Sequence, residues 1–112
     1  MEQIFNKLVR DNIPDIIKNN GDEAVTRTLE REEYRTELNK KLLEEVNEVL
    51  DAGNNEETLE ELADVLEIIK SIAELNNNKL DDVINAAEQK RIKRGGFEKR
   101  IFLEKTYSKN NN

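Results

Sequence analysis

The sequence contains no cysteine, no histidine and no tryptophan among its 112 residues. Without cysteine the chain forms no disulfide bonds, and without histidine it cannot use Ser-His or Cys-His nucleophilic catalysis. The absence of both residue types also removes the usual ligands of zinc. Any chemistry of this protein must therefore rest on carboxylates, amines and guanidinium groups.

Long apolar runs are missing as well. No stretch approaches the ~20 apolar residues of a membrane-spanning helix, and the opening MEQIFNKLVRD lacks the apolar run of a secretory signal. We therefore expect a cytoplasmic protein without membrane contact. The formal net charge of -7 argues against general binding to the backbone of DNA or RNA.

Aromatic residues are few, with three Phe and two Tyr, and charged residues make up 38% of the chain. The mean hydropathy of -0.85 is low, but the apolar residues recur with the period of a folded helix. The length predicts one domain over residues 1–112, in which 108–112 form a loose tail. Because so small a core covers little surface, we expect subunits to associate.

Four segments have helical patterns. DNIPDIIKNNG (11–21) predicts a short helix with Asp11 or Asn12 as its cap, Pro14 in its first turn and Gly21 at its end. The other patterns predict helices over about 31–52, 56–75 and 79–94. Gly53 suits the end of the first of these three helices, and the asparagines at 54 and 55 can cap the next.

Two segments lack a helical pattern. EAVTRTL (23–29) is expected to form a short strand or an extended arm, because β-branched residues alternate in it loosely. FEKRIFLEKTYS (97–108) contains Phe97, Ile101, Phe102 and Leu103, and we expect it to dock back onto the helices as a strand or an arm.

Paired carboxylates occur in two consecutive predicted helices. LLEEVNEVL (42–50) carries Glu45 and Glu48, and LEELADVLEII (59–69) carries Glu61 and Asp64, each pair three residues apart. These residues can be half-exposed rim positions that pair with Lys or Arg on neighbouring helices. Alternatively, the short loop between the helices favours antiparallel packing, which would bring four carboxylates together without local cations. Such a group suits Mg²⁺ or Mn²⁺.

The last predicted helix carries the opposite charge near its end. Lys90, Arg91 and Arg94 continue the apolar stripe that starts at Leu80. Basic residues in a last turn often serve only the helix dipole or extend to the rim. Near a metal-binding carboxylate group, they are also what a polyphosphate requires.

Three segments together resemble a known superfamily. EEVNE (44–48) followed by ELAD (61–64) is similar to the Glu-Glu-x-x-Glu and Glu-x-x-Asp signature of the all-α nucleoside triphosphate pyrophosphohydrolases, which include MazG, the dimeric dUTPases and the phosphoribosyl-ATP pyrophosphohydrolases. KLVRDNIPDII (7–17) resembles the opening of a MazG-like branch called house-cleaning pyrophosphatases. EQKRIKRGGF (88–97) resembles the later basic segment, although Glu88 stands where MazG-type sequences often have asparagine.

The resemblance implies an all-α helical bundle with short extended N- and C-terminal arms, assembled as a homodimer or homotetramer. It implies Mg²⁺-dependent hydrolysis of a modified or surplus nucleoside triphosphate between the α and β phosphates. The implied metal ligands are Glu45, Glu48, Glu61 and Asp64, with Glu44 as a further ligand or the base that orients water. Lys90, Lys93 and Arg94 would contact phosphate.

A second hypothesis is a helical module of the same fold that binds nucleotide or a partner without catalysis. The run Leu59, Leu62, Leu66, Ile69 and Ala73 favours subunit packing under either hypothesis. No motif in the sequence identifies the base of the nucleotide.

Overall fold

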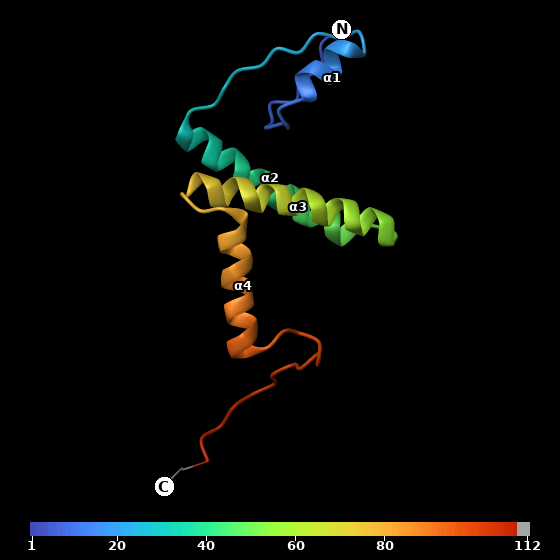
Figure 1. The fold of residues 1–112 in the computed structure, drawn as a ribbon. Helices are drawn as coiled ribbons and strands as arrows, with labels where there is room; N and C mark the ends of the chain where they lie inside the picture. The colour runs from blue at the N-terminus through green and yellow to red at the C-terminus, as the bar shows by residue number, and fades with distance from the viewer. Residues whose placement is uncertain (110–112) are drawn as a thin grey trace. The chain divides into compact units, whose positions relative to one another are not determined.

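A computed structural model describes residues 1–109, and in that part of the chain all regular structure is helical. The helices are α1 (Ile13–Asn19), α2 (Arg31–Asp51), α3 (Asn55–Leu75) and α4 (Leu80–Arg94) (Figure 1). The predicted all-α fold class is confirmed. No helix of the described part is both long enough and apolar enough to cross a membrane.

The chain divides into two compact units, Met1–Leu80 and Asp81–Asn112. The first contains α1, α2 and α3, and the second contains nearly all of α4 and the segment that follows it. The single domain expected over residues 1–112 stays a prediction.

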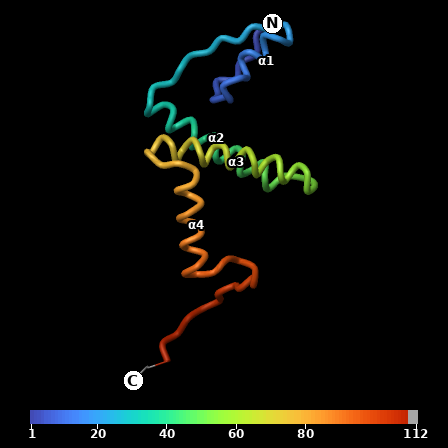
Figure 2. Tube along the Cα trace, viewed as in Figure 1, coloured from blue at the N-terminus to red at the C-terminus, as the bar shows by residue number. Residues whose placement is uncertain are grey.

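Helices α2 and α3 form an antiparallel hairpin, as the short loop predicted. The two helices lie side by side in the Cα trace of Figure 2. Their contact is the main helix–helix contact of the first unit. Arg31 begins α2, and its Nη2 donates to the carbonyl oxygen of Leu75, the last residue of α3, at 2.6 Å. The start of one helix therefore meets the end of the other.

Side-chain hydrogen bonds define the turn between these two helices. The Asn54 side chain accepts from the backbone N–H of Glu57 at 2.9 Å, which satisfies one of the free donors of the first turn of α3. The Glu57 side chain in turn accepts from the N–H of Gly53 at 2.9 Å. The predicted cap at position 54 is confirmed.

Helix α1 agrees with the prediction for residues 11–21. Asn12 occupies the N-cap position but its side chain makes no capping hydrogen bond, and Pro14 lies in the first turn. Gly21 has φ of 93°, a left-handed conformation that favours glycine and suits the end of a helix. Between Gly21 and α2 the chain forms an extended arm and no strand.

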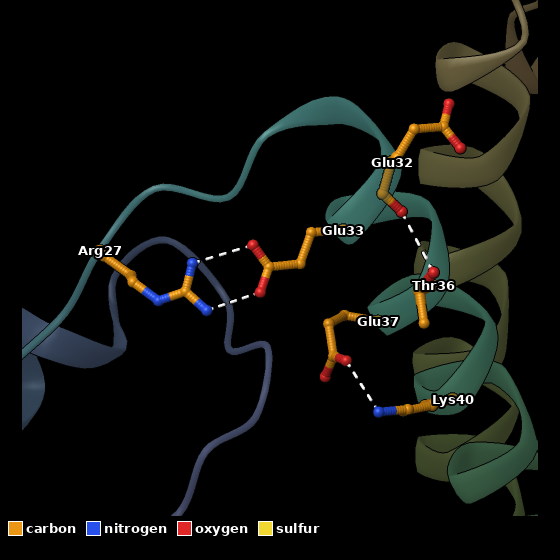
Figure 3. Close-up of polar contacts among 6 residues, drawn as sticks. All are labelled: Arg27, Glu32, Glu33, Thr36, Glu37 and Lys40. Carbon is orange, nitrogen blue, oxygen red and sulfur yellow. Dashed lines mark hydrogen bonds and ion pairs between the residues drawn. The ribbon is translucent and has the colours of Figure 1, made fainter.

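A bidentate ion pair connects this arm to the first turn of α2. Arg27 donates through Nη1 and Nη2 to the two carboxylate oxygens of Glu33, at 2.9 and 2.6 Å (Figure 3). One turn further along, Lys40 Nζ donates to Glu37 at 3.0 Å. These contacts place a cation beside two of the acidic residues of α2, Glu33 and Glu37.

The core of the first unit is small. Leu38 on α2 is 2% exposed and Ala73 on α3 is 7% exposed, and these are the buried apolar residues of the described chain. Much of the remaining apolar surface of the hairpin stays exposed, namely Leu43, Val46, Leu50, Leu59, Leu62 and Leu66. The hairpin therefore presents an apolar face that this chain's first unit does not cover.

In the second unit, α4 ends at Arg94 and Gly95 follows with φ of 83°. Arg91 then pairs with Glu98 at 2.8 Å. Beyond this turn, residues 101–109 form no strand, and Phe97, Ile101, Phe102 and Leu103 are exposed. Of the two forms expected for this segment, the described residues adopt the arm and not the strand, because the described part of the chain offers no strand to form a ladder with them. Residues 110–112 of the predicted loose tail lie outside the described residues.

Candidate metal centre

Three carboxylates meet between α2 and α3. Glu45 on α2 and Glu61 and Asp64 on α3 each present one oxygen, and these oxygens lie within 4.8 Å of one another. All three side chains are partly buried. In the part of the chain that the structure describes, these residues form the group that could hold a metal ion.

The helical pattern explains why these side chains meet. Glu61 shares one stripe of α3 with Val65, Ile68 and Ile72, and all four are partly buried. Residue 64 is three positions beyond residue 61, so it lies next to Glu61 on the helix surface. Because the hairpin is antiparallel, the middle of α2 faces this stripe, and the Glu45 side chain there is only 13% exposed.

The crowding of negative charge changes the acidity of Glu61. Burial raises the pKa of its carboxyl above the ordinary glutamate value, and the nearby charges of Asp64, Glu48, Glu45 and Glu60 raise it further. The charged form is thus disfavoured by its surroundings. A bound cation would reverse that preference.

Glu48 and Glu44 have different positions from the three grouped acids. Glu48 is exposed and lies outside the group of oxygens within 4.8 Å, although it is near enough for its charge to act on Glu61. Glu44 is exposed, and its carboxylate lies 3.7 Å from Lys41 Nζ. The assignment of Glu48 as a metal ligand and of Glu44 as a ligand or base stays a prediction.

Two cations contact the acidic group, which corrects the expectation of carboxylates without local cations. Lys41 Nζ lies 3.6 Å from Glu45, and the lysine side chain is 18% exposed. Arg10 Nη2 donates to Asp64 Oδ1 at 2.7 Å. Lys41 could have been found from its spacing of four residues before Glu45 on one helix. Arg10 is 54 residues from Asp64, and only tertiary structure brings them together.

A family model matches residues 33–96, more than half of the chain, and its description is the MazG nucleotide pyrophosphohydrolase domain. The chain belongs to this family. The predicted resemblance is confirmed, and membership supports a nucleotide pyrophosphohydrolase activity in general. Neither a search of curated proteins nor a search of solved structures found a match.

The MazG domain match includes the acidic group and also the basic end of α4. Lys90, Lys93 and Arg94 are exposed and belong to the second unit. Arg94 is the last residue of α4, and Lys93 lies in its last turn. The contact of these three residues with phosphate stays a prediction.

The three carboxylates of this MazG domain fit a divalent cation that prefers oxygen ligands. Oxygens bound to one Mg²⁺ lie at most about 4.2 Å apart, twice the metal–oxygen distance of roughly 2.1 Å. Small side-chain rotations would bring oxygens that now lie within 4.8 Å into that range. Burial and the neighbouring carboxylates raise the pKa of Glu61 although Arg10 and Lys41 contact the group, so a bound cation would stabilise its charged form.

Proposed function

We propose that this MazG domain hydrolyses a nucleoside triphosphate between the α and β phosphates, giving a monophosphate and pyrophosphate, with Mg²⁺ as its cofactor. Mn²⁺ would substitute for it. The observation that carries the proposal is the meeting of Glu45, Glu61 and Asp64 from two helices of the family's domain. A modified or surplus nucleotide is the substrate class that the resemblance favours.

The bound metal would polarise the phosphoryl group and lower the pKa of a water molecule, which makes histidine and cysteine unnecessary. Glu45, Glu61 and Asp64 would bind it, and Glu48 would be a further ligand from the next turn of α2. Glu44 is exposed and precedes Glu45 in the sequence, and it would accept a proton from the attacking water. Lys41 contacts both Glu44 and Glu45, so it would limit the repulsion between them.

The basic end of α4 would neutralise the phosphates. Lys90, Lys93 and Arg94 carry three positive charges within five residues of a chain whose net charge is -7. Charge-assisted contacts from Lys and Arg to non-bridging oxygens are among the stronger polar interactions in proteins. These residues would bind the substrate, while the carboxylates hold the metal.

The test is the release of pyrophosphate from a panel of nucleoside triphosphates, with Mg²⁺ and with excess EDTA. The expected products are a nucleoside monophosphate and pyrophosphate, formed only with the metal. Release of orthophosphate instead would show cleavage at another bond and would contradict the proposal. Nucleotide binding without any product would identify the alternative, a non-catalytic nucleotide-binding module of the same fold.

We also propose that the chain assembles as a homodimer or homotetramer. Leu43 and Leu50 on α2 and Leu59, Leu62 and Leu66 on α3 remain exposed in the first unit. Exposed apolar side chains at helical spacing are suited to helix–helix packing between subunits. The net charge of -7 argues against a nucleic acid as the partner.

A further inference from the structure

Arg10 is the guanidinium that the first unit places directly at the acidic group. It precedes α1, and its carbonyl oxygen accepts from the N–H of Ile13 at 3.0 Å, so its backbone is part of the turn that begins this helix. Its side chain reaches Asp64, which lies in the middle of α3. The segment before α1 therefore contacts one of the three carboxylates suited to a metal.

The two cations at this group are held differently. Lys41 is 18% exposed and shares α2 with both of its carboxylate partners. Arg10 has a side chain that is 58% exposed, and its partner Asp64 is 40% exposed. Exposed ion pairs contribute little net stability, because both groups are well solvated when apart. A divalent cation would therefore displace Arg10 from Asp64 at low cost, and the released guanidinium would be within reach of an anion bound at the metal.

We propose that Arg10 is a phosphate-binding residue that donates its hydrogen bond to Asp64 until metal and substrate arrive, and then donates to phosphate oxygens. The proposal rests on the proposed function of the site. An arginine keeps its charge at every physiological pH, so the guanidinium stays able to bind an anion once Asp64 binds a cation. A metal-bound polyphosphate supplies one there, and the planar fork of arginine matches its oxygens.

If Arg10 moves from Asp64 to phosphate in this way, removing its charge should have opposite effects on the affinities for Mg²⁺ and for a polyphosphate. For Arg10→Gln, Mg²⁺ alone should bind about two- to fivefold more tightly, because no cation competes for Asp64. Inorganic tripolyphosphate, added at saturating Mg²⁺, should bind about tenfold or more weakly, because a charge-assisted contact is lost. Both affinities are measured by titration calorimetry, and this probe contains no base whose identity could influence the result.

Arg27→Gln is the matched control. It removes the same charge from the same unit and breaks a bidentate pair with Glu33 (Figure 3), away from the acidic group. It should leave both affinities within about twofold of wild type. Arg10→Lys, which keeps the charge and loses the fork, should bind tripolyphosphate with an affinity between those of Arg10→Gln and wild type. Circular dichroism checks that each variant is folded.

Four results would overturn the inference. Tripolyphosphate affinity of Arg10→Gln within twofold of wild type would show an ordinary surface ion pair. Equal losses in Arg10→Gln and Arg27→Gln would show bulk electrostatics. Weaker binding of Mg²⁺ alone would show that Arg10 supports the carboxylates, and no wild-type affinity for the probe would exclude a phosphate contact. Pyrophosphate release by the wild type is measured separately, so failure of the proposed function is distinguishable.

Discussion

Glu61 is the residue in which folding and function oppose each other most directly. Its carboxylate belongs to a partly buried stripe of α3 with three aliphatic side chains and has other carboxylates as neighbours. A carboxylate in such a place destabilises the metal-free protein, because its charged form loses solvation and is repelled. A metal-binding role gives a reason for this residue type at this position.

Glu61→Gln should abolish pyrophosphate release and should not lower the melting temperature of the metal-free protein. The amide keeps the shape of the side chain and removes the repelled charge, while the metal loses a ligand. Differential scanning calorimetry in EDTA and a pyrophosphate assay measure the two effects. Glu60→Gln, at the exposed neighbouring position, is the control and should keep most of the activity. A Glu61→Gln variant with wild-type turnover would exclude this residue as a ligand.

The raised pKa of Glu61 also predicts a pH dependence of stability. Between the ordinary value of 4.5 and the higher native pKa, the folded state binds more protons than the unfolded state. The contribution of Glu61 to the free energy of unfolding should therefore fall as the pH rises through this window. Urea denaturation in EDTA at several pH values should show a steeper fall for wild type than for Glu61→Gln. Parallel curves would contradict the assigned environment of the carboxyl group.

Helix α3 positions two of the grouped acids, so the turn that begins it affects the site. Asn54→Ala should lower the free energy of unfolding by about 1 kcal/mol, because the N–H of Glu57 loses its side-chain acceptor. Asn55→Ala, at the first helical position, removes no such bond and should cost much less. Chemical denaturation of the two variants gives the comparison. Equal losses would mean that the asparagine side chain at position 54 does not cap the helix.

Helix α4 carries the predicted phosphate-binding residues, and its contribution can be separated from that of the acids. Lys90→Ala should weaken nucleotide binding or slow turnover by about tenfold or more, as expected for a lost charge-assisted contact of about 1.5–3 kcal/mol. The affinity for Mg²⁺ alone should change little. Lys99→Ala removes the same charge outside the helix and should have a much smaller effect. A similar loss in both variants would indicate a general electrostatic effect.

At the scale of the whole molecule, the α2–α3 hairpin carries more apolar side chains than the packing of its two helices buries. Wild-type protein should sediment as a dimer or tetramer, and Leu62→Glu should shift it towards a smaller species, because a charge in an apolar interface is costly. Val25→Glu introduces the same charge on the exposed arm and should keep the wild-type assembly. Sedimentation velocity measures the assembly of the wild type and of both variants. A monomeric wild type would contradict the proposed assembly.

The sequence by itself determined the helices, their ends and the family. Residues that act locally decide these features: the left-handed Gly21 and Gly95 lie just beyond helix ends, Asn54 caps α3, and the apolar period distinguishes a helix from a strand. Pairs such as Glu61 and Asp64 are neighbours on any helix, so their proximity needed no tertiary structure. The short loop between α2 and α3 was enough to predict the antiparallel hairpin, in which α2 lies opposite these two residues.

Tertiary structure decided which charges meet across the chain. It placed Glu45 within reach of Glu61 and Asp64 and left Glu48 outside their group, because this depends on the axial offset and rotation of two packed helices. It also brought Arg10 to Asp64 from 54 residues away. No local pattern specifies that pair, since the path of α1 and the following arm sets the distance between them. For the apolar segment after α4 the sequence pattern left a strand and an arm open, and the described residues form an arm, since a strand requires a pairing partner that the sequence pattern alone does not provide.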